Sequence, residues 1–375
     1  MYARQNFNFI VASIKILYLF RRPVQQQMKL ARIGQIPHDY FFGYTQLSKK
    51  FQKKVSDRIF ALKILWAVEL YLIRAIYPFT RVGFSFISVL RHLGDIQKAD
   101  VVFATADTYG LPLGFLKQLG VVKNSVVLYT GGLCDAMVES KSDLYRMFCR
   151  ASLKNISTVI SGVQNECQKM TQILKLPPEK FRFVPYGIDT NYFKPKPSTN
   201  HEDYILTIGA DFKRDWDLFQ KVAKSLPVVK FLIITAPQSI KIDMPKNVEI
   251  IYNQPIGKVR EYIKNCLLVL ILSKQNYRFA GQSTIFRAMA CAKPVIFTQS
   301  HGVEDYPGLL NYKNCIMVPP NDLKPTVEAI RYLLKDKNRA KLMGDKAREF
   351  ILKYASYNNY TKQLEKIFTT AYRIK

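Results

Sequence analysis

Short apolar runs, separated by stretches of helical character, recur along the chain and restrict its fold more than any other feature. Runs that are apolar without alternation indicate strands buried on both faces, as in parallel sheets covered by helices. The first four are "ADVVFATA" (99–106), "SVVLYTGG" (125–132), "STVISG" (157–162) and "FRFVPYG" (181–187). This succession predicts an α/β domain with a parallel sheet.

The same pattern restarts after a polar, proline-rich segment, "KPKPSTNHED" (194–203). The later apolar runs cover 204–210, 230–236, 248–253, 266–273, 293–299 and 315–320, and the chain from 323 to 372 has helical character. We therefore predict two doubly wound, Rossmann-like α/β domains joined by one linker. In such domains ligands bind at the carboxyl ends of the strands.

The predicted domain boundaries follow from these runs. They are a basic and apolar extension at 1–27, a first domain at 28–193, a linker at 194–203, a second domain at 204–355 and a C-terminal helix at 356–375. We expect the C-terminal helix to pack back on the first domain. Inside the first domain, the sequence suggests a short strand over 28–37 and a helix with a basic face over 41–54.

Two apolar segments near the N-terminus raise the question of a membrane. The run "FNFIVASIKILYLF" (7–20) contains Lys15 and is shorter than the roughly 20 residues that span a bilayer. An interfacial helix lying on a membrane surface and a helix packed on the domain surface both fit it. Residues 58–77 form a second apolar helix, and Glu69 in its middle argues against a full span.

The chain is strongly basic. Its 375 residues include 56 Lys and Arg against 28 Asp and Glu, a net charge of +28, which indicates an anionic partner. The excess coincides with apolar residues near the N-terminus, which favours an anionic membrane surface over nucleic acid. No zinc-finger or RNA-binding signature occurs. The six cysteines show no CxxC pair, so we expect neither a metal site nor a disulfide framework, as in a cytosolic protein.

A glycine turn opens a predicted helix after the run 266–273. It consists of Gly281, Gln282, Ser283 and Thr284. Free backbone N–H groups and the helix dipole favour an anion at such a position, and the natural guest is a diphosphate. The alternative is an ordinary helix cap without a ligand.

A second loop follows the run 204–210 and contains Gly209, Lys213 and Arg214. The planar guanidinium of arginine matches phosphate oxygens. Since both loops lie at strand ends of one domain, we expect them to face one cleft. Solvated surface charge is the alternative interpretation of Lys213 and Arg214.

Loops of the first domain are predicted to face the same cleft. The candidates for contact with a ligand are Gly43, Asp107, Thr130, Gly131 and Asp135. A helix cap is the alternative role of each aspartate. In the second domain, "SHGVEDY" adds His301, interpreted as a surface residue, and Glu304, which is a candidate for a hydroxyl ligand.

Four stretches together resemble a known family. They are "RFVPYGIDTNYFKP" (182–195), "IGADFKRDWDLF" (208–219), "GQSTIFRAMACAKPVI" (281–296) and "HGVEDY" (301–306). In order and spacing they are similar to the retaining nucleotide-sugar glycosyltransferases of the GT-B fold, in particular the large family 4. The resemblance covers residues 155–372 well and the preceding part only in outline.

The resemblance implies a nucleoside-diphosphate sugar, UDP- or GDP-linked, bound mainly by the second domain. It implies that the diphosphate contacts Arg214 and the 281–284 turn, and that no metal or other cofactor is needed. Arg287 stands where the family has a glutamate that binds the ribose. An arginine cannot accept the ribose hydroxyl hydrogens, so we expect it to contact phosphate or another chain, or to mark a loss of activity. Phe279 and Ala210 also replace family residues, and a first-domain histidine is absent.

The sequence therefore predicts a retaining glycosyltransferase, peripheral on the cytoplasmic face of a membrane, that acts on a lipid-linked or other membrane-borne glycan acceptor. The catalytic candidates are Arg214, Asp107 and Glu304; the candidates for donor binding are Gly209, Lys213, Arg214, Gly281, Gln282, Ser283, Thr284 and Arg287. Three alternatives stay open: a non-catalytic glycosyltransferase-like subunit, a polyanion-binding protein and an isomerase that acts on the nucleotide sugar.

Overall fold

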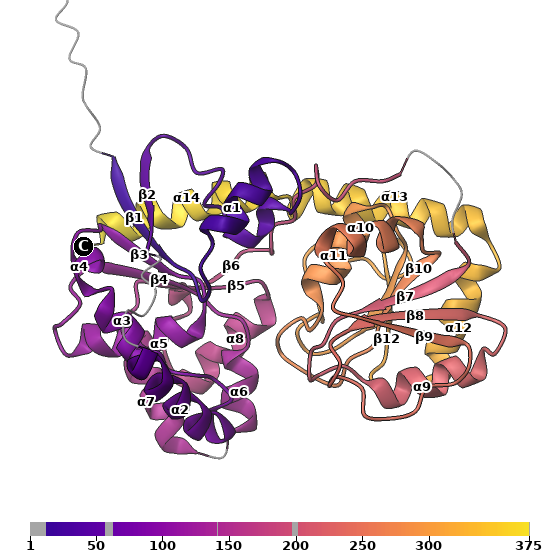
Figure 1. Cartoon of the computed structure of the whole chain (residues 1–375), viewed down its shortest axis with the longest axis horizontal. Coiled ribbons are helices and arrows are strands. Elements are labelled where there is room, and N and C mark those ends of the chain that lie inside the picture. Colours follow the sequence, from indigo (N-terminus) through magenta and orange to yellow (C-terminus); the bar gives the residue numbers. More distant parts are fainter. Residues whose placement is uncertain (1–12, 57–62, 141, 197–201, 375) are drawn as a thin grey trace, which may run out of the picture.

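The chain folds into two α/β domains, each built on a six-stranded parallel sheet with helices on both faces (Figure 1). The computed structural model describes residues 13–56, 63–140, 142–196 and 202–374. The strand order is β2-β1-β3-β4-β5-β6 in the first sheet and β12-β11-β10-β7-β8-β9 in the second. This is the GT-B arrangement of two Rossmann-like domains, as the sequence predicted.

The strands are short and largely buried. Those of the first sheet are β1 Ile14–Leu19, β2 Phe51–Val55, β3 Val101–Ala104, β4 Ser125–Tyr129, β5 Thr158–Ser161 and β6 Phe181–Phe183. Those of the second are β7 Tyr204–Ile208, β8 Lys230–Thr235, β9 Val248–Tyr252, β10 Leu268–Ile271, β11 Val295–Thr298 and β12 Ile316–Val318. From β3 onward, each strand falls within a predicted apolar run, so those predictions are confirmed.

Helices separate the strands. Those before the second sheet are α1 Gln25–Arg32, η1 His38–Phe41, α2 Lys63–Thr80, α3 Phe86–Arg91, α4 Leu93–Gln97, α5 Asp107–Gln118, α6 Leu133–Glu139, α7 Asp143–Asn155, α8 Gln164–Leu174 and η2 Pro178–Lys180. The later ones are α9 Trp216–Ser225, α10 Ile256–Asn265, α11 Gln282–Ala290, α12 Leu323–Leu334, α13 Lys337–Tyr354 and α14 Tyr357–Arg373. The predicted helices over 58–77 and 323–372 are confirmed where the structure describes them.

Alternate residues of the central strands enter different cores. In β1, Ile16 and Tyr18 join a core that includes residues of α14, whereas Leu17 and Leu19 join the core under α5 and α7. A strand has a period of two, so apolar residues on both faces produce an apolar run without alternation. The same division holds in β7, where Leu206 and Ile205 belong to opposite cores.

The last helix crosses from the second domain to the first. Helix α14 runs along the first sheet in Figure 1, and its Phe368 contacts Tyr18 and Phe103 with ring centroids 6.1 and 5.2 Å apart. Ser125 of β4 donates a hydrogen bond of 2.7 Å to the carbonyl of Ala371. The first domain therefore takes part of its core from the end of the chain.

The interfacial helix expected over residues 7–20 is wrong, because Ile14–Leu19 form β1, which is hydrogen-bonded between β2 and β3. Residues 1–12 lie outside the described part. The run is apolar because the strand is buried on both faces, a cause that periodicity alone cannot distinguish from a buried helix. Lys15 lies near the start of the strand, where its side chain is exposed.

Two further expectations in the first domain are also wrong. The first half of the strand predicted over 28–37 belongs to helix α1 and the rest is turn, and the helix predicted over 41–54 is a turn followed by β2. In β2 the residues Lys53 and Lys54 pair with β1, and Lys53 donates to the carbonyl of Tyr44 at 2.8 Å. Tertiary pairing at the sheet edge overrides the weak helical pattern of this segment.

No helix among the described residues is long and apolar enough to cross a membrane. Glu69 of α2 is buried, and its Oε1 accepts a hydrogen bond of 2.9 Å from the backbone of Ser88. The six cysteines are buried and unpaired. Of the predicted linker, residues 197–201 lie outside the described part.

Candidate functional site

Arg214 lies between two glycine turns at strand ends of the second domain. Gly209 follows β7 and Gly281 precedes α11, and both have positive φ, at 127° and 95°. A Cβ atom on either glycine would lie 2.6 or 2.7 Å from an Nη atom of Arg214. Both positions need glycine for two reasons: the positive φ of the backbone and the close approach of the guanidinium.

The Arg214 guanidinium is buried, and no carboxylate among the described residues forms an ion pair with it. It is 4% exposed, and its Nη2 donates to the carbonyl of Ile208 at 2.8 Å. Its Nε has no hydrogen-bond partner among the described residues. Asp211 acts on it electrostatically, but that carboxylate is bonded to Arg278 at 2.6 Å. Desolvation lowers the pKa of Arg214 to about 10, so an anion at this place would offset the cost of its burial.

The first turn of α11 adds polar groups next to Arg214. Helix α11 begins after Gly281 and has no side-chain cap, so its first N–H groups point out of the helix end. Ser283 and Thr284 are half-buried on this turn. Gln282 instead contacts the first domain, since its Nε2 donates at 2.9 Å both to the carbonyl of Gly162 and to the hydroxyl of Tyr306.

Two ion pairs connect the domains along the cleft. Lys213 is paired with Glu139 at the end of α6. Arg278 is paired with Asp135 of α6, 3.3 Å between Nε and Oδ2, and with Asp211 of the second domain. Asp135 also accepts from the backbone N–H of Tyr277 at 2.6 Å. These contacts hold the strand ends of one domain against those of the other.

Arg287 forms a third connection. It is buried in α11, and its Nη2 lies 3.1 Å from Oδ1 of Asp39 in the first domain. The guanidinium also packs against the rings of Tyr40 and Phe193, at 5.0 and 5.2 Å from their centroids. The sequence suggested contact with phosphate or another chain, whereas the structure pairs Arg287 with a carboxylate of the same chain.

A cavity of about 900 Å³ lies at the carboxyl ends of β1, β3 and β4 in the first domain. Helices α2 and α3 form one wall, and Phe212 and Arg278 reach it from the second domain. Asp107 lies inside it at the start of α5, and its Oδ2 accepts from the N–H of Gly131 at 3.1 Å. Burial raises the pKa of Asp107 to about 6, which suits a group that exchanges protons near neutral pH.

The remaining candidates are distributed between cavity, core and surface. Gly131 and Asp135 line the cavity together with Asp107. Thr130 is buried, and Gly43 packs against Leu364 of α14. Glu304 and His301 are hydrogen-bonded near the surface, with 3.3 Å between Oε1 and Nδ1, and His301 stacks on Tyr277. The structure thus brings Asp107 and Asp135 into one cavity but leaves Glu304 in a separate contact.

Sequence reasoning missed two charged groups at this interface, Asp39 and Arg278, and one buried carboxylate of the first domain, Glu166. Arg278 lies in the loop before Gly281, so its place after a strand was a usable signal. Glu166 lies in the first turn of α8, where it is buried and bonded to the hydroxyl of Ser161. Burial raises the pKa of Glu166 to about 8. Its partner Ser161 is only five residues away in the chain, but the local sequence pattern does not show that both are buried.

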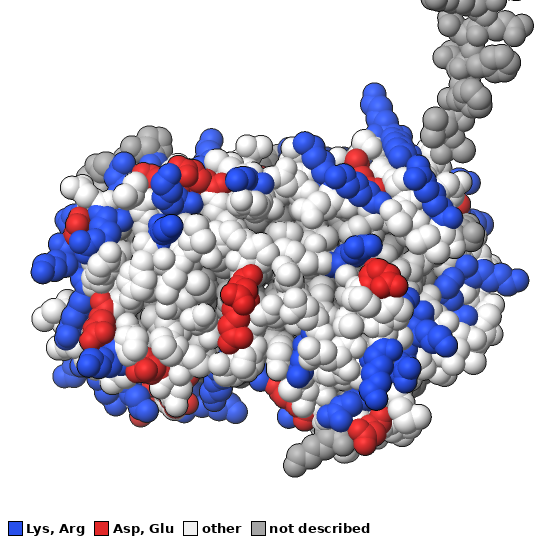
Figure 2. Space-filling view, turned by 180° about the vertical axis from the view of Figure 1, so that it is seen from behind, with Lys and Arg blue, Asp and Glu red and all other residues white. Residues whose placement is uncertain are grey.

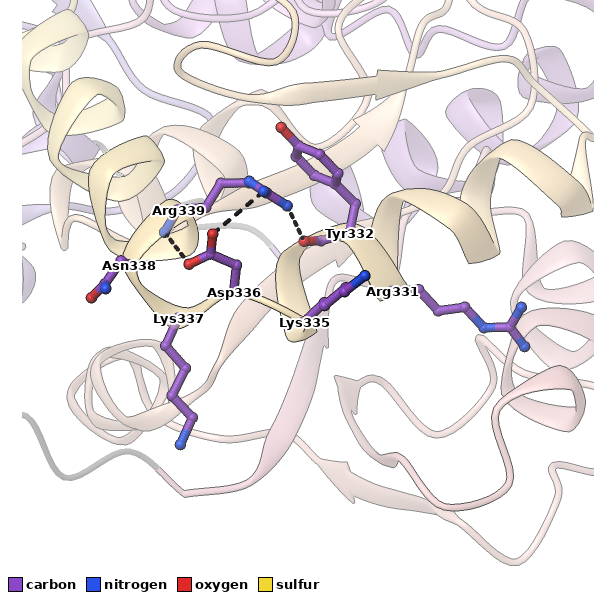
Figure 3. A pocket seen from close by; sticks show the side chains of 7 residues that line it. All are labelled: Arg331, Tyr332, Lys335, Asp336, Lys337, Asn338 and Arg339. Atoms are coloured by element: carbon purple, nitrogen blue, oxygen red, sulfur yellow. Dashed lines mark hydrogen bonds and ion pairs between the residues drawn. The ribbon is translucent and has the colours of Figure 1, made fainter.

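A second hollow, of about 560 Å³, lies where α12 meets α13 (Figure 3). Asp336 accepts from the backbone N–H of Arg339 at 3.0 Å, and the Arg339 side chain is bonded to Asp336 and to the carbonyl of Tyr332. Arg331, Lys335 and Lys337 point in different directions in Figure 3. The polar groups here stabilise a helix junction and do not converge on a ligand.

The basic residues do not form one continuous patch on the face shown in Figure 2. Lys and Arg side chains lie mainly around its margins, with acidic side chains among them. Nucleic-acid binding usually relies on basic residues gathered on one face or stripe. This face lacks such a stripe.

Comparison with known proteins shows a similarity in the second domain. Residues 202–350 match the family model "Glycosyl transferases group 1". The second domain is thus similar to the glycosyl transferases of group 1. The matched segment includes β7 to β12 and both glycine turns around Arg214. No curated protein sequence matches the chain.

Solved structures resemble the whole two-domain chain. Anabaena Alr3699/HepE, crystallised with UDP-glucose, has a TM-score of 0.66 at 15% identity, over 95% of this chain and 100% of that one. Sucrose-phosphate synthase from Thermosynechococcus elongatus has a TM-score of 0.66 at 14% identity, over 96% of this chain and 100% of that one. The N-terminal domain of Candida albicans trehalose-6-phosphate phosphatase has a TM-score of 0.68 at 11% identity, over 96% of this chain and 97% of that one. At these identities the likeness shows the GT-B fold of this chain and not its reaction.

Proposed function

We propose that the protein transfers a sugar from a nucleoside-diphosphate sugar to an acceptor, with retention at the anomeric carbon, as in family 4. The observation that carries the proposal is Arg214, a buried guanidinium without its own carboxylate at the N-terminal end of α11. A diphosphate supplies the missing negative charge, and the helix end supplies N–H donors. The family match of the second domain and the UDP-glucose complex of Anabaena HepE support this donor class.

The charges around the site suggest how the leaving group would be stabilised. As the bond from sugar to diphosphate breaks, negative charge develops on the diphosphate. Arg214 and the first turn of α11 are fixed before the reaction, so they stabilise this charge without reorganising. We propose that these groups serve in place of a metal ion.

We propose that the acceptor enters the first-domain cavity. Asp107 and Asp135 offer carboxylates that bind hydroxyl groups, and Asp107 has a raised pKa suited to proton exchange with an acceptor hydroxyl. The arginines Arg21, Arg22 and Arg81 line the same cavity. This combination suits a glycan that carries a phosphate group, and a lipid-linked glycan is one such acceptor.

A donor screen tests this function. The purified chain is titrated calorimetrically with UDP-, GDP- and ADP-glucose, and products are sought by mass spectrometry. We expect one nucleotide to bind and Arg214→Met to weaken it by at least about tenfold, without loss of thermal stability because a buried unpaired charge is removed. Arg331→Met, at an exposed position of α12, is the control. Equal affinity in wild type and Arg214→Met would refute the assignment.

One observation favours a second candidate, a non-catalytic glycosyltransferase-like subunit. Arg287 occupies the position of the family's ribose-binding glutamate and is bonded to Asp39, so other groups would have to bind the ribose. If none of the nucleotide sugars produces heat, this second candidate replaces the first. Binding without any product, in the presence of a range of acceptors, would also favour it.

A further inference from the structure

Helix α2 has two apolar sides: one faces the first-domain cavity and the other faces outward. Its inner side contributes Leu70, Ile73 and Tyr77 to the first-domain cavity, and Glu69 on that side is fixed by Ser88. Its outer side exposes Leu65, Val68, Tyr71, Leu72 and Phe79. The spacing of three and four residues places these five on one face of the helix.

The exposure on this outer face is large for apolar side chains. Tyr71 is 73% exposed and Phe79 is 74% exposed. At the start of α7, Leu144 and Met147 are also exposed, and the hydroxyl of Ser140 just before α7 donates to the carbonyl of Phe79. In Figure 1 α2, α6 and α7 lie together at one end of the first domain. Exposed apolar side chains gathered in this way are typical of a docking surface.

The charges next to the patch are positive. Arg74 on α2 and Arg81 just after it are exposed, and Arg21 and Arg22 are exposed where they line the cavity beside α2. Glu69, the acidic residue of α2, is buried. In the part of the chain that the structure describes, the carboxylates of Asp143 and Glu139 near the patch are paired with Arg146 and Lys213. Apolar side chains flanked by exposed cations match the interface of a bilayer that contains anionic lipids.

We propose that the outer face of α2, with the start of α7, docks on an anionic lipid surface. This inference deepens the proposed function and rests on it, because the opposite side of the same helix lines the acceptor cavity. Docking brings the arginines of that cavity next to the lipid head groups. An acceptor carried by a phosphate-linked lipid then enters the cavity without leaving the membrane.

Vesicle flotation of the full chain tests the docking surface. We expect the wild type to float with vesicles of phosphatidylcholine and phosphatidylglycerol, more weakly with phosphatidylcholine alone, and less as salt increases. The double variant Tyr71→Ser with Phe79→Ser should lose at least about tenfold in the fraction bound, because two large apolar groups no longer enter the interface. Both side chains are exposed, so the fold should tolerate the change.

The matched control is Val228→Ser with Leu342→Ser, two exposed apolar residues of the second domain that are 95% and 61% exposed. It should float like the wild type. The proposal is overturned if the wild type does not float with anionic vesicles. It is also overturned if both double variants lose the same fraction of vesicle binding. Light scattering that shows a dimer, converted to monomer by the α2 variant, assigns the face to a second copy instead.

The donor titration separates this inference from the proposed function. Nucleotide-sugar binding in solution depends on the second domain and should be the same in the α2 variant. If vesicle binding fails while the donor still binds, only the docking surface is wrong. If vesicle binding succeeds but no donor binds, the membrane surface stands and the transferase assignment falls.

Discussion

Arg287 of the second domain and Asp39 of the first form a buried ion pair, with 3.1 Å between Nη2 and Oδ1, at the interface of the two domains. The Asp39 side chain has no exposed surface, and burial raises its pKa while Arg287 opposes that rise. The two residues are 248 positions apart in the chain. Folding of either domain alone leaves one of these charges without its partner.

We therefore expect Asp39→Ala to destabilise the protein by about 3–5 kcal/mol, because it strands the Arg287 cation. Arg287→Met should cost less, since the Asp39 carboxyl can take up a proton, and its stability should fall as the pH rises. Urea denaturation of both variants and of the double variant measures the coupling. The exposed pair Lys230 and Glu249 is the control, expected to contribute no more than about 1 kcal/mol.

Gly281→Ala should displace Arg214. The residue has φ 95°, and a Cβ would lie 2.7 Å from Nη1 of Arg214 and 2.9 Å from Cγ2 of Ile271. We expect nucleotide affinity to fall at least about tenfold, together with a loss of stability from the strained backbone. Gly120→Ala is the matched control, because φ there is 73° but no atom lies within 4 Å of the added Cβ. Similar nucleotide affinities in the two variants would contradict the placement of Arg214.

The stability of the protein should depend on pH through Glu166. The folded-state pKa of Glu166 is raised to about 8, above the ordinary value of 4.5. The stability linked to this group is therefore fully present below pH 4.5 and is lost as the pH rises through 8. Glu166→Gln removes this loss and should be more stable than wild type at pH 9 by about 2–4 kcal/mol. Thermal denaturation across this range measures it. Glu328→Gln, on the exposed side of α12, should leave the pH dependence unchanged.

The cleft should open when the Arg278 contacts are removed. Asp135 accepts from Arg278 and from the backbone of Tyr277, so Asp135→Asn weakens two connections between the domains. We expect a larger radius of gyration in small-angle X-ray scattering and weaker protection of the α6 amides in hydrogen exchange. The control is Asp143→Asn, because Asp143 forms an ion pair with Arg146 inside α7 and does not connect the domains. An unchanged radius together with unchanged exchange would argue against this connection.

Much of the fold was predictable because parallel strands buried on both faces leave apolar runs in the sequence. This signal located every strand from Val101 to Val318. It failed for Ile14–Leu19, where the same buried environment gave a run that also fits a helix. It failed again at Phe51–Val55, where lysines on an edge strand resemble the polar face of a helix.

The site was predictable where candidate residues lie in the loops and helix starts that follow strands. Gly209, Arg214 and Gly281 come together as neighbouring loops of one sheet should, and Asp107 and Asp135 line one cavity. The partner of Arg287 was not predictable, because Asp39 comes from a short helix of the other domain. The role of Gln282 was hidden for the same reason, since the carbonyl that it contacts belongs to Gly162.

The packing of α14 on the first sheet also affects the order of assembly during synthesis. Phe368 and Ala371 complete contacts with Tyr18 and Ser125, yet the ribosome adds them only after the whole second domain. Until α14 has been synthesised, the surface of the first sheet that it covers stays exposed to water in the nascent first domain. Chaperones that hold exposed apolar surface have their longest opportunity to act during this interval.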